Sequence, residues 1–237
     1  MNTVILMAGS SNEFFKDGSK FPKFLYEING KPLVEHVYNN LKSLNSNFIF
    51  VINAEDAQKW HLNKVIELID PSAKVITINN ETQGAACSAL YAIDHISNDE
   101  ELVLTNGDQI INADLNNIIN DLKLYDAGTV VFESIHPRWS YVKTDENNHV
   151  IEASEKKPIS KQATAGIYYY KKGKDFIESA SSMIKKDTHT NGQFYICPTF
   201  NELILNNKTV GASRINREHY HSLTSVKAIE EYSKELI

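Results

Sequence analysis

The first half of the chain alternates short apolar strand signals with helical ones, and this alternation constrains the fold more than any other feature. Residues 3–9 (TVILMAG) and 48–53 (FIFVIN) are short apolar runs rich in β-branched residues, as buried strands are. Between them, residues 31–44 carry apolar side chains at helical spacing. Strands that alternate with helices of about a dozen residues predict right-handed crossovers and a mainly parallel sheet. We therefore expect an α/β fold.

The alternation continues to about residue 134, and the pattern then changes. The further elements predicted in this part are helices over 57–69, 84–96 and 114–125, and strands over 74–79, 101–108 and 127–134. Beyond it, we predict a hairpin over 140–158, strands over 163–173, 209–215 and 218–223, and helices over 174–186, 197–207 and 225–237. We predict a Rossmann-like, mainly parallel sheet flanked by helices, with an antiparallel-rich C-terminal extension. One domain would then comprise two halves, 1–135 and 136–237.

Composition narrows the class of partner. The 237 residues carry a net charge of −6 and no dense run of Lys and Arg, which argues against a nucleic-acid partner. No apolar stretch approaches the ~20 residues that a membrane helix needs, and the N-terminus shows no basic leader with a cleavage site. Cys87 and Cys197 lie far apart, as in a reduced protein. We expect a cytoplasmic protein without a membrane partner.

Two polar segments follow predicted strands, where ligands bind in open parallel sheets. The loop after Gly9 offers backbone N–H groups to an anion, and Lys23, preceded by a stiffening Pro22, adds a point charge. Asp108 follows a glycine at the end of the strand at 101–108, and a carboxylate there suits Mg²⁺, which takes one or two carboxylates plus substrate phosphates. Each feature alone has an ordinary alternative: a surface loop with a lysine, and an aspartate that caps a turn.

Five segments in order carry a resemblance to a known family. They are residues 5–25 (ILMAGSSNEFFKDGSKFPKFL), 82–90 (TQGAACSAL), 104–111 (LTNGDQII), 155–173 (EKKPISKQATAGIYYYKKG) and 191–204 (NGQFYICPTFNELI). Together they resemble the sugar-nucleotide pyrophosphorylases, which are sugar-phosphate nucleotidyltransferases of the nucleotide-diphospho-sugar transferase fold. The resemblance covers nearly the whole chain. It is strongest to members associated with capsule and lipopolysaccharide genes.

The resemblance implies an enzyme, a reaction and a set of site residues. A Mg²⁺-dependent nucleotidyltransferase would join an NTP, with a pyrimidine favoured, to a sugar 1-phosphate or similar phosphorylated acceptor and release pyrophosphate. Its product would feed cell-surface polysaccharide synthesis. Lys23 and Asp108 would be catalytic, with Asp108 holding the metal. The implied nucleotide contacts are Ala8, Gly9, Ser10, Ser11, Gln83, Gly84, Asn106 and Gly107, and the implied acceptor contacts are Glu155, Lys157, Gly166 and Gln193. Whether the chain forms a homo-oligomer is left open by the sequence.

Four positions depart from the family pattern. Ser11 stands where the family repeats a glycine, Glu13 where it has the arginine that clamps the triphosphate, and Gln193 where a sugar-binding glutamate is common. Residues 221–229 lack the aspartate that supplies a second metal ligand in many members. An anion in place of a cation beside a triphosphate reverses a contribution typically worth a few kcal/mol, so Glu13 is the serious departure.

Three explanations for Glu13 at this position remain, and two alternative functions remain with them. Lys16 or Lys20 reaches the phosphates instead, Glu13 joins the metal shell, or triphosphate chemistry has been lost. The last would make the chain a non-catalytic nucleotide or sugar-nucleotide binding protein. A glycosyltransferase of the same broad fold is the other alternative, but such enzymes usually carry an Asp-x-Asp metal motif, and residues 106–108 contain a single acid.

Two smaller features have an ordinary explanation that we favour. Arg138, beside Trp139, would either border the acceptor pocket with its charge on a phosphate or belong to a connector in which Trp139 packs. Tyr168, Tyr169 and Tyr170 alternate on a predicted strand, so we expect one or two of them in the core.

Overall fold

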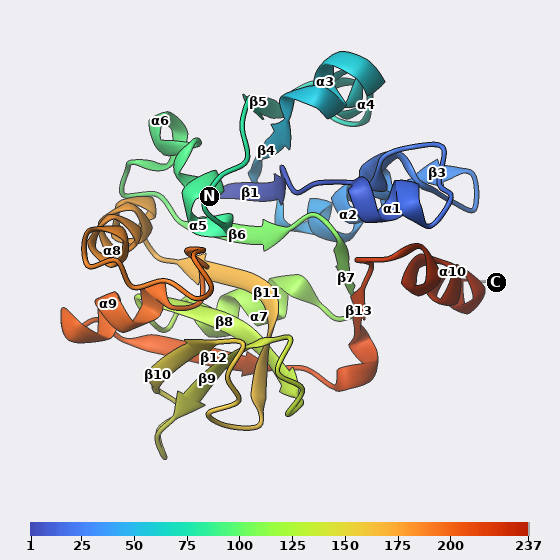
Figure 1. Cartoon of the computed structure of the whole chain (residues 1–237). Helices are drawn as coiled ribbons and strands as arrows, with labels where there is room; N and C mark the ends of the chain where they lie inside the picture. Colours follow the sequence, from blue (N-terminus) through green and yellow to red (C-terminus); the bar gives the residue numbers. More distant parts are fainter. Residues whose placement is uncertain (237) are drawn as a thin grey trace.

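A nine-stranded sheet crosses the whole molecule, whose computed structural model describes residues 1–236 (Figure 1). Its strands run in the order β10-β9-β11-β6-β1-β4-β5, with β8 beside β11 and β12 beside β8. The parallel part consists of β1 (Asn2–Met7), β4 (Asn47–Asn53), β5 (Lys74–Ile78) and β6 (Leu102–Asn106). These strands match the predicted apolar runs, because a strand covered on both faces must be apolar at nearly every position.

Helices cover both faces of the sheet and form two apolar cores. Alternate residues of one strand point to opposite faces, so Ile5 packs in one core and Val4 in the other. The first core includes side chains from α2 (Leu33–Leu41), α4 (Leu62–Ile69), α7 (Leu115–Leu122) and α10 (Val226–Glu235). The second includes side chains from α5 (Ala85–Leu90), α6 (Ile93–Ile96), α8 (Gly173–Lys185) and α9 (Thr199–Leu205).

Most of the antiparallel strands belong to this same sheet rather than to a separate unit. The central one is β11 (Gln162–Tyr170), which pairs with β6 on one side and with β8 (Ala127–Glu133) on the other. The predicted hairpin is confirmed as β9 (Ser140–Thr144) and β10 (Val150–Glu155). β12 (Val210–Arg214) runs parallel to β8, so the extension is not purely antiparallel. The fold class is confirmed, and the division into two halves stays a prediction.

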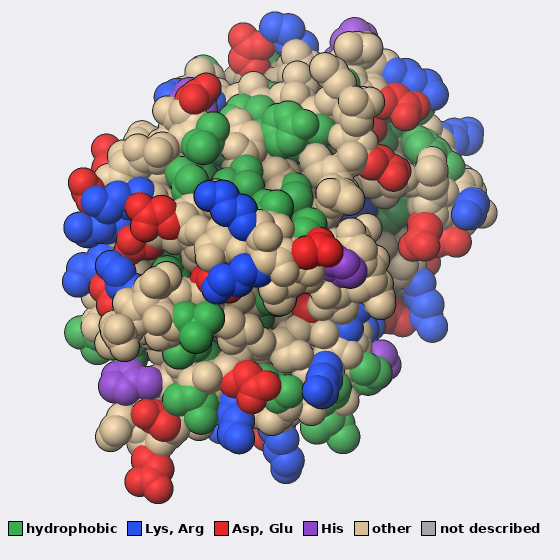
Figure 2. Space-filling model, turned by 60° about the vertical axis from the view of Figure 1, so that its left-hand side comes forward, with side chains coloured by type: hydrophobic (Ala, Val, Ile, Leu, Met, Phe, Trp, Pro, Cys, Tyr) green, Lys and Arg blue, Asp and Glu red, His purple; other side chains and the backbone are tan. Residues whose placement is uncertain are grey.

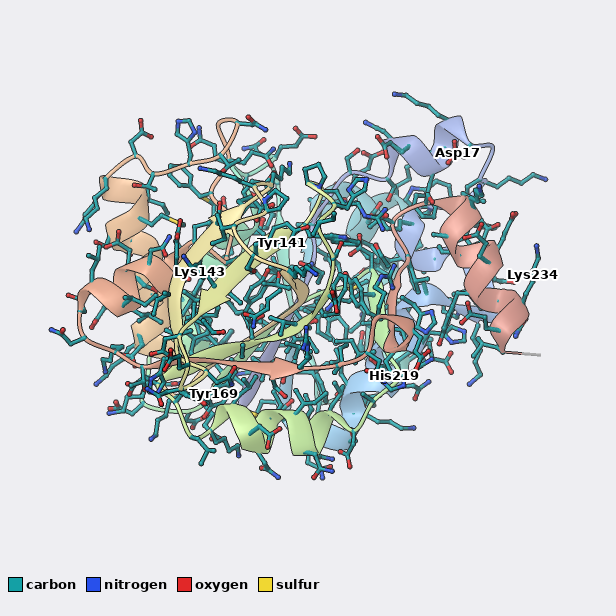
Figure 3. All side chains as sticks on the ribbon, turned by 90° about the horizontal axis from the view of Figure 1, so that it is seen from below. Asp17, Tyr141, Lys143, Tyr169, His219 and Lys234 are labelled. Carbon is teal, nitrogen blue, oxygen red and sulfur yellow. The ribbon has the colours of Figure 1, made fainter. Side chains whose placement is uncertain are left out.

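Tyr168, Tyr169 and Tyr170 are all buried, so the core takes one more tyrosine than predicted. They reach opposite faces of β11: Tyr169 packs in the first core, and its two neighbours pack in the second. β9 shows the same alternation, because Tyr141, labelled in the interior in Figure 3, packs in the first core and Val142 packs in the second. The extension therefore packs through both faces of its strands.

Three elements that we predicted as continuous are interrupted in the structure. Residues 57–69 form two helices, α3 (Ala54–Trp60) and α4, because His61 takes a left-handed backbone with φ of 57°. Residues 84–96 also form two, since the chain turns between α5 and α6 with the Ala92 N–H on the Ala89 carbonyl. Residues 218–223 begin with a 3₁₀ turn, η3 (Arg217–His219), before the short strand β13 (Tyr220–Ser222). No glycine or proline marks any of these breaks in the sequence.

The last segment of the chain returns to the first loop. β13 pairs with β7 (Gln109–Ile111), and α10 follows it and lies beside the hairpin of β2 (Glu27–Ile28) and β3 (Lys31–Pro32), as Figures 1 and 3 show. The Ser233 hydroxyl donates to the Asn29 side-chain oxygen at 3.1 Å. The Leu223 N–H donates to the Asp108 carbonyl at 2.8 Å, which fixes residues 223–225 beside the end of β6.

The surface carries charges of both signs. On the face that Figure 2 shows, lysine and arginine side chains alternate with acidic ones, and no single sign covers a continuous area. Among residues 1–236, no helix combines the length and the apolar character that a bilayer-crossing segment requires.

Candidate active site

Lys23 and Asp108 meet at the carboxyl edge of the parallel strands. β1 and β6 are neighbours, so the segments that follow them emerge side by side, and the Gly107 N–H donates to the Leu6 carbonyl at 2.9 Å. The Lys23 ammonium (Nζ) lies 2.8 Å from Asp108 Oδ2, and the two side chains are only 12% and 20% exposed. Two residues that lie 85 positions apart therefore form one ion pair.

The ion pair lies in the wall of a pocket of about 520 Å³, which we call the loop pocket. The loop after β1, the turn before α5, the end of β6 and the segments at 193–195 and 224 form its wall. The polar and small residues of that wall are Ala8, Gly9, Ser10, Lys23, Glu81, Thr82, Gly84, Ala85, Ser88, Asn106, Asp108, Gln193, Tyr195 and Thr224. Most of the predicted nucleotide contacts are thus brought together.

A second pocket of about 220 Å³, the sheet pocket, adjoins the first. Its wall consists of Ala85, Asn106, Arg138, Trp139, Ser140, Glu155, Thr164, Gly166, Tyr168, Tyr195, Ile196 and Tyr220. Ala85, Asn106 and Tyr195 belong to both walls. Two of the predicted acceptor contacts, Glu155 and Gly166, therefore lie beside the predicted nucleotide contacts.

Gly166 lets the two halves of the chain meet at the site. It lies at an irregularity in the pairing of β11 with β8 and has φ of 66°, which strains any residue with a Cβ. A Cβ here would lie 2.2 Å from Gln109 Oε1 and 2.7 Å from Asn106 Nδ2. β11 therefore approaches the turn after β6 as closely as a bare backbone allows.

Gly84 likewise allows two backbone segments to approach closely, here at the wall of the loop pocket. Its φ is 108°, and a Cβ would lie 2.4 Å from the Phe194 carbonyl oxygen. The Phe194 N–H donates to the Gln83 carbonyl at 2.7 Å, and the Ala86 N–H donates to the Phe194 carbonyl at 3.0 Å. The Gln83 side chain is exposed and outside both pocket walls, so here Gln83 acts through its backbone.

Glu155 is a buried carboxylate in the wall of the sheet pocket. It is 8% exposed, and the Ser140 hydroxyl donates to its Oε2. Burial raises the pKa of Glu155 above its ordinary value, while the hydrogen bond from Ser140 and the charge of Lys156 oppose the rise. The carboxylate thus remains able to accept a hydrogen bond from a hydroxyl group in the pocket.

Two predicted acceptor contacts, Lys157 and Gln193, lie outside the wall of the sheet pocket. Lys157 is exposed and outside both pocket walls, because Lys156 takes a left-handed backbone (φ 55°) and turns the chain. Instead, the Lys156 ammonium donates to the Tyr195 hydroxyl at 2.7 Å, and that hydroxyl donates to Gln193 Oε1 at 3.2 Å. Gln193 belongs to the loop pocket, not the sheet pocket. Lys156 is also exposed and outside both walls, and it reaches the site through Tyr195; both were missed because only the fold shows which of two adjacent lysines contacts a wall residue.

Glu13 does not face the loop pocket. The segment after Ser11 forms a short helix, α1 (Asn12–Lys16), whose Phe14 is buried, and Glu13 is exposed on it. Glu13 is absent from both pocket walls, as are Lys16 and Lys20. The expectation that Glu13 lies beside the phosphates is therefore wrong, because Glu13 occupies an exposed position on α1.

Ser11 supports Lys23 rather than a ligand. It is buried outside the walls of the loop and sheet pockets, and its hydroxyl accepts from the Lys23 N–H at 3.1 Å. This bond fixes the turn that aims Lys23 at Asp108. A glycine at this position could not make it.

Asp108 is suited to a metal ion that arrives with its ligand. Within residues 1–236, no three His, Cys, Asp or Glu side chains cluster as a preformed metal site. Asp108 uses Oδ2 for Lys23, so its Oδ1 takes no part in that ion pair. Thr224 lies in the same wall, in the region where the family pattern has an aspartate. One carboxylate is enough for Mg²⁺ when substrate phosphates supply further oxygens.

Comparison with known proteins points to one family. The sequence model of the family described as nucleotidyl transferase matches residues 2–206. A UTP–glucose-1-phosphate uridylyltransferase, AglF, of Haloferax volcanii is 25% identical over 227 residues, which are 91% of this chain and 88% of that protein. The bifunctional protein GlmU of Methanococcus aeolicus is 28% identical over 176 residues, and the match spans 72% of this chain but only 40% of GlmU.

Solved structures share the fold across the whole chain. A nucleoside-diphosphate-sugar pyrophosphorylase from Vibrio cholerae superposes with a TM-score of 0.83 at 23% identity, covering 98% of this chain and 99% of that one. An inositol-1-phosphate CTP transferase from T. maritima gives 0.75 at 15% identity, with 99% and 94% covered. At these identities the likeness concerns the fold.

Proposed function

The chain belongs to the nucleotidyl transferase family, and from this premise we propose that it transfers a nucleoside monophosphate from an NTP to a phosphorylated small-molecule acceptor and releases pyrophosphate. The observation that carries the proposal is the Lys23–Asp108 pair in the wall of the loop pocket, which shares Asn106 and Tyr195 with the adjoining sheet pocket. The loop pocket would take the nucleotide, and the sheet pocket the acceptor.

In this reaction an acceptor phosphate oxygen attacks the α-phosphorus of the NTP. A new P–O bond forms as the bond to the β-phosphate oxygen breaks, and pyrophosphate departs with the electron pair. The acceptor phosphate is already anionic, so the protein needs no general base. Its task is to align the two phosphates and to neutralise charge.

Lys23 would supply the neutralising charge. Its ammonium group pairs with Asp108 Oδ2 at 2.8 Å. An ammonium group has three donors, so it can keep this bond and also contact phosphate oxygens. Asp108 would hold Mg²⁺, which neutralises charge on the phosphate oxygens when bound. The hydrogen bond from Lys23 N–H to Ser11 keeps the lysine aimed at the pocket.

The remaining wall residues fit the two substrates. The turn at Gly84 and the paired hydroxyls of Thr82 and Ser88, 2.6 Å apart, offer hydrogen bonds to a nucleobase edge. A pyrimidine is favoured by the resemblance, and the names of AglF and of the T. maritima protein carry UTP and CTP. Glu155 would accept from an acceptor hydroxyl. Supply of cell-surface precursors in the cytoplasm rests on the resemblance alone.

The test is pyrophosphate release by the purified, folded chain. CTP, UTP, dTTP, ATP and GTP are each offered with Mg²⁺ and a panel of sugar 1-phosphates and polyol phosphates. We expect release that requires both the acceptor and Mg²⁺ and is greatest with a pyrimidine nucleotide. Lys16→Ala is the matched control for Lys23→Ala, because Lys16 lies outside both pocket walls. No release in any combination would refute the proposal.

The non-catalytic alternative has lost its main support. It depended on a negative charge among the phosphate-facing positions, and Glu13 lies outside both walls. Tight binding of an NDP-sugar without turnover would restore it.

A further inference from the structure

Arginine is scarce in this chain, and two of the three arginines lie together. Of 24 cationic side chains, only Arg138, Arg214 and Arg217 are arginines. Arg138 precedes β9, Arg217 begins η3, and both line a third pocket of about 580 Å³, the arginine pocket. Bringing together residues 79 positions apart makes this a property of the fold rather than of a local basic run.

The arginine pocket opens beside the site already described. It shares Arg138 and Tyr220 with the sheet pocket and Thr224 with the loop pocket. Burial and then the charge of Asp108 raise the pKa of Tyr220, while the charges of Arg217 and Arg138 oppose the rise. Both guanidinium groups therefore lie near the tyrosine that separates the arginine pocket from the sheet pocket.

Both guanidinium groups are held in place without being neutralised. Arg138 stacks on Trp139, with 4.1 Å from its guanidinium carbon to the ring centroid. Arg217 Nη1 donates to the Tyr220 carbonyl at 2.6 Å, and its guanidinium lies 5.2 Å from the Phe132 ring centroid. Within residues 1–236 neither has a carboxylate within 4.0 Å, whereas Arg214 lies 3.8 Å from Glu133. Most of their N–H donors remain for a ligand.

Acidic residues also line the arginine pocket, and they lie away from its end at Arg138 and Tyr220, which is therefore the favoured place for an anion. Glu218, Glu231 and Glu235 come from η3 and α10. Each has a cationic or titratable neighbour: His219 at 4.0 Å, Lys227 at 3.9 Å and His221 at 3.4 Å, respectively. None of the three lines the sheet pocket, so an anion is favoured at the Arg138 and Tyr220 end.

We propose that the acceptor carries a second anionic group, a carboxylate or a second phosphate, and that Arg138 and Arg217 bind it. The proposal rests on the proposed function and names its substrate class. The attacking phosphate has to lie beside Lys23 and Asp108 in the loop pocket, and neither arginine belongs to that wall. The fork of a guanidinium group matches a carboxylate or a phosphate with two parallel hydrogen bonds. Arg138 and Arg217 thus select the acceptor.

Matched acceptors that differ by one charge test the proposal. Glucose 1-phosphate is compared with glucuronic acid 1-phosphate, and glycerol 3-phosphate with 3-phosphoglycerate; glucose 1,6-bisphosphate tests a second phosphate. Binding is measured by calorimetry and kcat/KM by pyrophosphate release. We expect at least one member with the second charge to bind about tenfold or more tightly than its neutral partner, because charge-assisted bidentate bonds are strong. The arm that shows the preference tells carboxylate from phosphate.

The variants are Arg138→Gln and Arg217→Gln, with Arg214→Gln as the matched control outside all three pockets. Either test variant should reduce the preference to about twofold or less, because it weakens binding of the charged member far more than binding of the neutral member. Arg138→Lys, which keeps the charge but loses the fork, should be intermediate. Arg214→Gln should keep the full preference.

Two results would overturn the proposal. One is equal binding of charged and neutral members by the wild-type protein in every pair. The other is an equal loss for both members in Arg138→Gln, because that would place the arginine on the shared phosphate. A preference in binding without any pyrophosphate release would instead refute the proposed function and leave the anion site standing.

Discussion

The two sides of the site are built in different ways. On the proposed nucleotide side, neighbouring parallel strands end together beside the Lys23–Asp108 pair. On the proposed acceptor side, the wall is assembled from side chains of distant segments, such as Arg138, Glu155 and Tyr220. The first arrangement follows from the topology of the sheet. The second depends on loops and antiparallel strands, whose side chains can change with little effect on the sheet.

This difference suggests a division of work. Groups fixed by strand ends would perform the phosphoryl chemistry common to many acceptors, and groups on the variable side would choose the acceptor. A change on the nucleotide side should therefore lower turnover with every acceptor, and a change on the acceptor side should alter preference.

Lys23→Ala should have the largest effect. It removes the cation closest to the proposed reaction centre and leaves Asp108 unpaired in a site where Asp108 is only 20% exposed. We expect kcat for pyrophosphate release to fall by about 10²–10³-fold, the usual effect of losing one electrostatic stabiliser of a transition state. Lys16→Ala, assayed beside it, should keep wild-type activity. A residual rate within tenfold of wild type would show that another cation does the work.

Gly166→Ala should break the contact between the two sides. The left-handed backbone costs about 1–2 kcal/mol for a residue with a Cβ, and the new methyl group would also displace Gln109 and Asn106. We expect a loss of about 2 kcal/mol or more in the free energy of unfolding, measured in urea, together with a loss of turnover.

Gly9→Ala is the control for Gly166→Ala, because a Cβ on Gly9 meets nothing within 4 Å and Gly9 lacks a left-handed backbone. Its free energy of unfolding should stay within about 0.5 kcal/mol of wild type. Equal destabilisation of both variants would mean that the approach of β11 to the turn after β6 is loose.

Glu155→Gln should sharpen the comparison through its pH dependence. Burial raises the pKa of Glu155, so the folded protein holds this proton more tightly than the unfolded chain. The favourable contribution of the protonated form is complete below the unfolded pKa and is lost as the pH rises through the folded pKa. The stability of Glu155→Gln relative to wild type should therefore increase as the pH rises from below the ordinary glutamate pKa through the raised folded pKa. A difference that does not vary with pH would show that Glu155 is not desolvated.

Glu13→Arg should have the smallest effect. Glu13 is exposed on α1 and outside both pocket walls, so the substitution puts a charge on the surface near the loop pocket but not in it. We expect kcat/KM for the nucleotide to stay the same or to rise by no more than about threefold, an effect of long-range attraction that salt would screen. A severe loss would give Glu13 a role in the reaction.

The part of the fold that sequence predicts is the part set by local pattern. The apolar runs of β1, β4 and β6 identify buried parallel strands, and the position of Asp108 after one of them places it at the ligand edge. The left-handed turn at His61 and the parallel pairing of β12 with β8 depend on contacts distant in sequence, and no local signal marks them.

The same distinction applies to the site. Lys23 and Asp108 were identified through short motifs, and the structure joins them. Which of Lys156 and Lys157 contacts the wall residue Tyr195 depends on the backbone at Lys156, and the presence of Arg138 and Arg217 in one pocket wall depends on the whole path of the chain. Composition cannot show either.

The most direct test of the division of work compares kcat/KM for a charged acceptor and its neutral partner in three proteins: wild type, Lys23→Arg and Arg138→Gln. We expect Lys23→Arg to lower both values by the same factor, so that their ratio stays within about twofold of wild type, and Arg138→Gln to lower the ratio by reducing the charged value far more than the neutral one. A ratio that changes in Lys23→Arg and persists in Arg138→Gln would contradict the division.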